Sequence, residues 1–263
     1  MPWKLKYLEI SKSADEWDEY LVEVPEGVLE NCHFLQKLAV DYSKLFGFDI
    51  DQICQNGETL QILSLERCNI EGLYEHCLLK SCEICENGEI DHRTELIQEL
   101  FTKCHQLTEL NIFKGVGDSP ILEDNILLDQ HICALVDNLT PNILKLNFGD
   151  QTRVKDEHVN TLVHRCNKIT ELDLSGTSIT NDSLESIITH LTSLEKLDLD
   201  FTNIDPSSIL QLKSIPSLKI LRCFHGENKE NPEKIKNLKQ QLPHISVNDY
   251  CSNARLHSLL SQN

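Results

Sequence analysis

The sequence predicts an α/β fold in which short strands and helices alternate along a curved solenoid. Three observations lead to this prediction. The spacing apolar-x-x-apolar-x-apolar recurs nine times, most successive copies start 24 to 36 residues apart, and a helical apolar pattern follows most copies. Four of the last five spacings lie within the range of 20–29 residues that is typical of leucine-rich repeats. Such units bury their apolar faces only by stacking, so we expect about nine strand–helix repeats in a horseshoe with a parallel concave sheet.

Each repeat frame predicts one strand, because apolar residues at alternate positions line one face of a strand. The nine frames are Leu5–Ile10, Leu35–Val40, Leu60–Leu65, Leu107–Ile112, Ile143–Phe148, Ile169–Leu174, Leu194–Leu199, Leu218–Cys223 and Leu242–Val247. Helical spacing of apolar residues predicts helices over 96–101, 132–136, 159–163, 184–191 and 235–242. Residues that suit a first helical turn mark several helix starts, namely Asp156, Asp182, Ser183, Pro206 and Pro232.

These elements predict one leucine-rich-repeat domain over residues 1–247 and a short C-terminal tail over 248–263. An insertion near residues 71–95 separates the third frame from the fourth. It contains Cys82-x-x-Cys85 together with His76, Cys77 and His92, which could supply the four ligands of a zinc site. The insertion has no second Cys-x-x-Cys pair, and cysteines occur throughout the chain. We therefore predict no metal and no cofactor.

Charge and composition exclude several classes of protein. The 263 residues carry a net charge of −18 and no basic run, which argues against nucleic acid and against anionic membrane surfaces as partners. No apolar stretch approaches the roughly 20 residues of a membrane span, and residues 1–4 do not begin a signal peptide. We expect a protein of the nucleus or cytoplasm, whose eleven cysteines are thiols.

Three of these cysteines recur at one place in the repeat. Cys32, Cys104 and Cys166 each lie three residues before the first apolar residue of a frame. This arrangement resembles the cysteine-containing leucine-rich repeats of F-box proteins, in which a buried thiol ends the helix beneath the next strand. Residues 143–255, including the segments 206–221, 238–248 and 253–255, resemble the closing repeats of the S-phase kinase-associated F-box family.

The resemblance implies a substrate receptor of a cullin-RING ubiquitin ligase, in which the repeats hold the substrate and an F-box holds the Skp adaptor. An F-box of about forty residues would precede the repeats, whereas the first frame here begins at Leu5, so the sequence contains no F-box. Either the chain is a fragment or short isoform, or it is a repeat protein without a connection to the ligase. Ligase components are expected to bind only if an F-box is supplied.

The concave face is the expected site of partner binding, because repeat proteins generally bind through this face. Residues between and after the repeat leucines should point into it. The acidic members are expected to form an exposed patch with Lys196 inside it, so that exchanging Asp173 and Asp198 for lysine would abolish binding and leave stability nearly unchanged. Phe113 and Phe224 are expected to be exposed anchors. The candidate residues are Glu109, Asn111, Phe113, Lys145, Glu171, Asp173, Lys196, Asp198, Asp200, Arg222 and Phe224.

No feature of the sequence indicates catalysis. Most cysteines fall at structural positions of the repeat, where a buried thiol is inert, and Gly115-Val-Gly117 lacks the further residues of a phosphate-binding loop. We therefore expect a nonenzymatic protein-interaction module that recognises substrates for an SCF-type ubiquitin ligase in protein degradation. The alternative is a ligase-independent acidic repeat adaptor or inhibitor. In both cases the predicted partner is a protein on the concave face.

Overall fold

A computed structural model describes residues 4–10, 22–23, 28–40, 43–45, 47–66, 68–70, 92–114, 127–223 and 232–247. The strands are β1 (Tyr7–Ile10), β2 (Val22–Glu23), β3 (Lys37–Val40), β4 (Ser43–Leu45), β5 (Ile62–Ser64), β6 (Asn69–Ile70), β7 (Glu109–Asn111), β8 (Lys145–Asn147), β9 (Glu171–Asp173), β10 (Lys196–Asp198), β11 (Ile220–Arg222) and β12 (Ser246–Val247). The α-helices are α1 (Gly47–Cys54), α2 (His92–Lys103), α4 (Asp129–Asn138), α5 (Asp156–Arg165), α6 (Asn181–His190) and α7 (Pro232–Gln241), and the 3₁₀ helices are η1 (Leu29–Asn31) and η4 (Ser208–Ser214).

Nine of the strands form a single sheet in the order β1-β3-β5-β7-β8-β9-β10-β11-β12. Each of them lies in one of the nine predicted frames, and every neighbouring pair is parallel, which confirms the predicted fold class. The middle residue of each strand from β7 to β11 is a repeat leucine, and the register pairs it with the next one along the sheet. The repeat leucines therefore form one continuous buried row.

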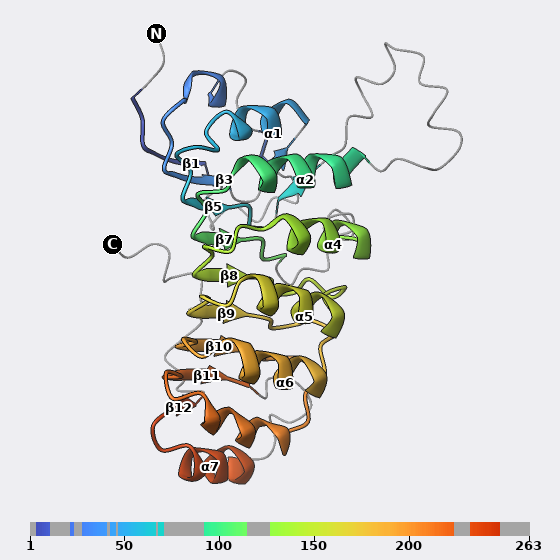
Figure 1. Ribbon diagram of the computed structural model, residues 1–263, viewed down its shortest axis with the longest axis vertical. Coiled ribbons are helices and arrows are strands. Elements are labelled where there is room, and N and C mark those ends of the chain that lie inside the picture. The colour runs from blue at the N-terminus through green and yellow to red at the C-terminus, as the bar shows by residue number, and fades with distance from the viewer. Residues whose placement is uncertain are drawn as a thin grey trace, which may run out of the picture.

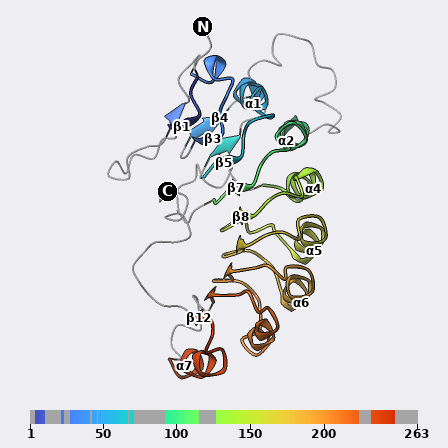
Figure 2. The same cartoon turned by 60° about the vertical axis from the view of Figure 1, so that its left-hand side comes forward.

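The array is curved, with the sheet on its inner side and the helices on its outer side (Figure 2). Figure 1 shows α2, α4, α5 and α6 stacked side by side in the same order as their strands. Apolar side chains of the helices and of the outer strand face meet between the two layers and form one continuous core. This arrangement is the leucine-rich-repeat horseshoe that the repeat frames predict.

The predicted helix starts are close to the observed ones. Helix α5 begins at Asp156 and α7 at Pro232, while α6 begins at Asn181 with Thr180 as its cap, whose side chain accepts a hydrogen bond from the Asp182 backbone nitrogen. The segment after Pro206 forms the 3₁₀ helix η4. A second parallel sheet of two- and three-residue strands, β2-β4-β6, was not predicted, since such short strands carry no periodic signal.

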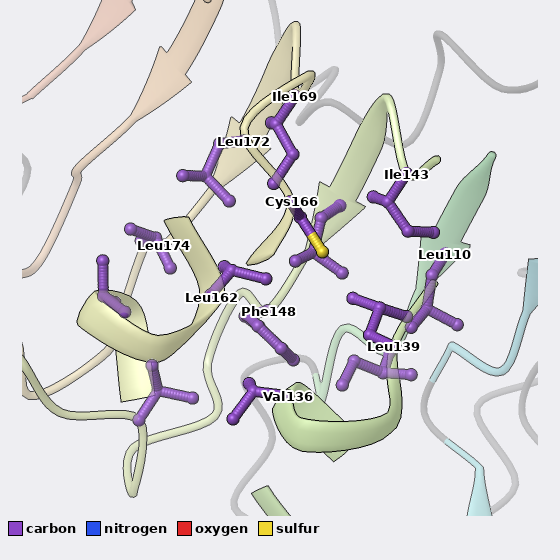
Figure 3. Close-up of a cluster of buried hydrophobic side chains, with 14 of the residues drawn as sticks. Leu110, Val136, Leu139, Ile143, Phe148, Leu162, Cys166, Ile169, Leu172 and Leu174 are labelled. Atoms are coloured by element: carbon purple, nitrogen blue, oxygen red, sulfur yellow. The ribbon is translucent and has the colours of Figure 1, made fainter. Parts of the chain in front are cut away.

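The repeat cysteines end helices and lie in the core, as predicted. Cys32, Cys104 and Cys166 have no exposed surface, and the Cys166 thiol donates a hydrogen bond to the carbonyl oxygen of Thr140 at 3.4 Å. Figure 3 shows Cys166 among apolar side chains that include Ile143, Leu162 and Ile169. Burial raises the pKa of the Cys166 thiol to about 11, so this thiol is protonated and unreactive at neutral pH.

Replacing Cys166 with serine is expected to lower the free energy of unfolding by about 1–3 kcal/mol, because a hydroxyl is costlier to bury than a thiol, and alanine should cost less. In the native protein Cys166 should react with a thiol reagent far more slowly than the exposed Cys133. Urea denaturation and mass-resolved labelling check the two statements. Equal labelling rates for Cys133 and Cys166 would contradict the buried position.

A carboxylate joins the starts of helices α5 and α6. Asp156 Oδ1 accepts hydrogen bonds from the backbone nitrogens of Thr180 and Ser183 at 2.8 and 3.1 Å, and Oδ2 accepts one from the Thr180 hydroxyl at 2.7 Å. Burial by itself raises the pKa of Asp156, but the hydrogen bonds from Ser183 and Thr180 outweigh burial and lower it. The ionised form of Asp156 therefore stabilises the junction between these two repeats.

Asp156→Ala is expected to lower the free energy of unfolding at pH 7 by about 1–3 kcal/mol. Because the pKa of Asp156 is lower in the folded than in the unfolded chain, its contribution is complete above the unfolded value near 3.9 and is lost as the pH falls through the folded value. The difference in free energy of unfolding between wild type and Asp156→Ala, measured by urea denaturation, should therefore shrink below pH 4. Asp182→Ala, which removes an exposed carboxylate from the first turn of helix α6 on the other side of the junction, is the control. A pH-independent difference would contradict this role.

Two predicted segments lie wholly or mostly outside the described residues. These are the C-terminal tail 248–263 and residues 71–91 of the insertion, which include Cys77, Cys82 and Cys85. The zinc hypothesis for the insertion and the domain boundaries therefore stay predictions. In the described parts of the chain, every helix is too short or too polar to cross a bilayer.

Candidate protein-interaction surface

The first residues of four central strands form a ladder of alternating charge on the concave face. Register pairs Glu109 of β7 with Lys145 of β8, Lys145 with Glu171 of β9, and Glu171 with Lys196 of β10. The Lys145 ammonium lies 3.0 Å from Glu109 and 4.0 Å from Glu171, and the Lys196 ammonium lies 3.0 Å from Glu171. We call these four residues the charge ladder.

The charge ladder neutralises itself, because each inner member lies between two residues of opposite charge. Its side chains are 15 to 31% exposed, so these ion pairs are partly shielded from solvent. Directly opposite charges on neighbouring strands contribute roughly 0.2–1 kcal/mol per pair to sheet stability. Glu171 and Lys196 therefore contribute to pairing between strands, and Lys196 lies beside Glu171 as expected for a lysine inside the acidic patch.

The third residue of each of these strands has a structural role that the sequence analysis missed. Asn111, Asn147, Asp173 and Asp198 each accept a hydrogen bond, through side-chain Oδ1, from the backbone nitrogen two residues later, at 2.8 to 3.1 Å. This short polar bridge turns the chain off its strand. The signal was present in the sequence, because an asparagine or aspartate follows the central leucine in four consecutive repeats.

These strand-end residues are buried, which contradicts the exposed acidic patch that the sequence analysis expected. Asn111, Asp173 and Asp198 are only 2 to 3% exposed, and Asp200 is 7% exposed. For Asn111, Asp173 and Asp198 the Oδ1 bridge holds the side chain against its own backbone rather than extending it into solvent. The prediction that lysine at positions 173 and 198 leaves stability unchanged is therefore wrong.

Asp198 occupies an electrostatically unfavourable position. Its register partners are Asp173 on one side and Arg222 on the other, and Arg222 Nη1 lies 3.5 Å from Asp198 Oδ2. Burial, followed by the neighbouring carboxylates of Asp173 and Asp200, raises the pKa of Asp198 well above its usual range, and Arg222 only partly offsets this. Ionised Asp198 thus costs stability at neutral pH.

The two predicted aromatic anchors have different outcomes. Phe113 is 1% exposed, so the prediction that it is an exposed anchor is wrong. Its ring lies against Gly149 of the next repeat, where a Cβ would come within 2.6 Å of Phe113 Cδ2. The missing side chain at Gly149 provides the space that the ring fills. Phe224 lies outside the described residues, and its role stays a prediction.

A different aromatic residue is exposed beside this surface. Phe201, in the loop after β10, is 53% exposed and has a backbone φ of 58°. The preceding repeat has Gly176 at the same position with a φ of 67°, which is the residue type that suits this conformation. A left-handed backbone costs a bulky residue roughly 1 kcal/mol, so phenylalanine is retained here at a cost to stability. An aromatic residue at a glycine position is the sequence signal that could have identified it.

The row of the charge ladder continues into an apolar residue. Ile220 of β11 is the register partner of Lys196 and is 41% exposed. Ile220 and Phe201 belong to the same two adjoining repeats. We call these two residues the apolar pair, since each exposes a large apolar side chain on one of two adjoining repeats. Ile220 lies in the row of the ladder, and Phe201 lies in the loop beyond the end of β10. Aromatic anchors in particular dominate the energetics of protein interfaces.

Comparison with known proteins supports the fold. No family model matches the chain. A chain in the crystal structure of the Rad7 and Elc1 complex in yeast superposes with a TM-score of 0.53 at 14% sequence identity. The match covers 86% of this chain and 54% of that chain, so the present chain spans about half the length of its neighbour. At this identity the likeness concerns the fold alone.

Proposed function

We propose that this chain is a nonenzymatic protein-binding module that recognises substrates for an SCF-type cullin-RING ubiquitin ligase, in the nucleus or cytoplasm. The single observation that carries the binding role is Phe201, a half-exposed aromatic side chain on a left-handed backbone. The same left-handed turn occurs at Asp150 and Gly176 in the two preceding repeats, so the feature particular to this repeat is the exposed aromatic side chain. The curved sheet presents the neighbouring Ile220 on the same repeats, so a partner can contact both.

The link to the ligase is supported by the resemblance of residues 143–255 to the closing repeats of the S-phase kinase-associated F-box family. The fold that the chain shares with a protein from the Rad7 and Elc1 complex supports the repeat architecture on which this resemblance depends. Binding of the Skp adaptor and of cullin to this protein requires an F-box in addition to the repeats described above.

The second candidate function is a ligase-independent acidic repeat adaptor or inhibitor. The observation that favours it is the net charge of −18, which attracts basic protein partners over a long range without any ligase component. Both candidates use the same surface, but only the first predicts that ligase components accompany the bound partner.

Phe201→Gly is expected to weaken partner binding at least tenfold while leaving the melting temperature unchanged or slightly higher. Loss of a central aromatic anchor typically costs a complex 2 kcal/mol or more, whereas glycine suits the positive φ at this position. The measurement is quantitative recovery of proteins that co-purify with the chain from cells, followed by the affinity of the purified pair.

The matched control is Leu128→Ala, which removes an exposed apolar side chain beside helix α4, away from the proposed binding surface. This variant should retain every partner. If Phe201→Gly and Leu128→Ala bind partners equally well, the apolar pair is not the anchor, and the proposed binding surface is refuted.

A further inference from the structure

A polar seam runs between helices α5 and α6 on the convex side of the solenoid. Asp156, Asn160 and His164 are spaced four residues apart and therefore lie along one face of α5. Their partners on α6 are Ser183, Ser186 and His190. Ser183 donates to Asp156, the Ser186 hydroxyl lies 3.2 Å from Asn160 Oδ1, and the rings of His164 and His190 lie with their centroids 4.0 Å apart. The seam thus ends in two adjacent imidazoles.

The hydrogen bonds of the two rings fix which nitrogen carries the proton. His164 Nδ1 lies 2.7 Å from the carbonyl oxygen of Asn160, and His190 Nδ1 lies 2.9 Å from that of Ser186. A carbonyl oxygen only accepts, so Nδ1 is the protonated nitrogen in both rings. In a neutral imidazole the other nitrogen, Nε2, then carries a lone pair. Both rings are thereby set in the tautomer that metal ions use, with the backbone holding Nδ1.

The surroundings of the pair favour a cation. A groove of about 450 Å³ runs along the seam, and His190 is one of its lining residues. The carboxylates of Asp156, Glu157, Asp182 and Glu185 line the same groove. Carboxylates on the walls of a cleft raise the local concentration of cations. The rings themselves are half-buried at His190 and exposed at His164, so an ion can reach them from solvent.

We propose that His164 and His190 together bind one divalent transition-metal ion of the class that prefers imidazole nitrogen, represented by Zn²⁺ and Ni²⁺, through Nε2 of each ring. An ion about 2.1 Å from each of two nitrogens at the tetrahedral angle sets those nitrogens about 3.4 Å apart. The ring centroids are 4.0 Å apart and tilted by 44°, so the two side chains must rotate to aim both Nε2 lone pairs at one ion, and the rings must move further apart as they do so. Hard ions such as Mg²⁺ prefer oxygen ligands and are not the expected occupants.

Water completes the coordination sphere. Within the described residues no three histidine, cysteine, aspartate or glutamate side chains gather closely enough to hold an ion, so the protein supplies two ligands. A site with two protein ligands binds its metal ion with a dissociation constant in the micromolar rather than the nanomolar range. Its occupancy therefore follows the concentration of free metal. Because the two ligands belong to successive repeats, the bound ion ties α5 to α6 and stabilises their junction.

The test is a titration of the purified chain with Ni²⁺ at pH 7.5 under reducing conditions, followed by equilibrium dialysis and by the melting temperature. His164→Ala and His190→Ala are each expected to bind one Ni²⁺ fewer than wild type, or to bind it at least tenfold more weakly, and to lose the rise in melting temperature.

His105→Ala is the matched control. His105 is also exposed, also has Nδ1 near a backbone carbonyl at 3.0 Å, and lies near one carboxylate, but among the described residues no second imidazole ring is paired with it. The His105→Ala variant should bind Ni²⁺ with the stoichiometry and affinity of wild type. Cysteine sites elsewhere in the chain are common to all four proteins and cancel in the comparison. The proposal is overturned if both seam variants keep the stoichiometry and affinity of wild type, or if the ion that they lose binds more weakly than about 1 mM.

Discussion

Asn56→Ala is expected to lower the free energy of unfolding by about 2–5 kcal/mol, because it leaves two buried backbone groups without partners. Asn56 is 1% exposed, and its side chain joins two repeats. Oδ1 accepts from the Leu35 backbone nitrogen at 2.9 Å, and Nδ2 donates to the Cys32 carbonyl at 2.7 Å. Alanine supplies neither group, and the turn that leads into strand β3 is then unsupported.

Urea denaturation of the variant measures this effect, with Asn138→Ala as the control. Asn138 also donates to a backbone carbonyl, that of Ala134 at 2.8 Å, but it is half-buried and its site is open to water. Its removal should cost less than about 1 kcal/mol. If the two variants lose equal free energies of unfolding, the hydrogen bonds from Asn56 to Cys32 and Leu35 contribute little to stability.

The double variant Asp173→Lys with Asp198→Lys is expected to have a free energy of unfolding about 4 kcal/mol or more below that of wild type, or to fail to fold. Both side chains are 3% exposed and accept hydrogen bonds from their own backbone two residues later. Lysine cannot accept those bonds, and it places two ammonium groups in a buried site beside Arg222. A melting temperature close to that of wild type would contradict the burial of this row.

Asp198→Asn separates the loss of charge from the loss of the bridge. Asparagine keeps the acceptor for the Asp200 nitrogen, and Asn111 and Asn147 already serve in this way in earlier repeats. Because the folded pKa of Asp198 lies above its unfolded value, ionisation costs stability at neutral pH, and that cost disappears as the pH falls toward the unfolded value. The variant should therefore match or exceed wild-type stability at pH 7, and its advantage should vanish near pH 4.

The sequence was sufficient to predict the strands of the nine-stranded sheet, the core row and the buried cysteines. The repeat frame requires apolar residues at fixed positions, and Leu110, Leu146, Leu172 and Cys166 could be buried only in one register. These features depend on local spacing, which a single sequence displays directly. The parallel order of the sheet then follows, because each strand must stack on the previous repeat.

The surface was less predictable, for reasons that particular residues explain. Alternation along a strand places Asp173 and Asp198 on the concave side, but it does not reveal that each side chain bends back to its own backbone. Phe113 was expected to be exposed because the space opposite it depends on Gly149, which lies 36 residues later in the chain. The His164–His190 pair likewise forms only when two repeats are stacked.

Affinity purification of the protein from cells, with quantification of the Skp adaptor and of cullin, tests the proposed function most directly. The account predicts that both co-purify when an F-box is supplied in the same polypeptide, together with a further protein whose recovery falls at least tenfold in Phe201→Gly and is unchanged in Leu128→Ala. Recovery of a partner that depends on Phe201, without the Skp adaptor and without cullin, would contradict the ligase role and favour the ligase-independent adaptor.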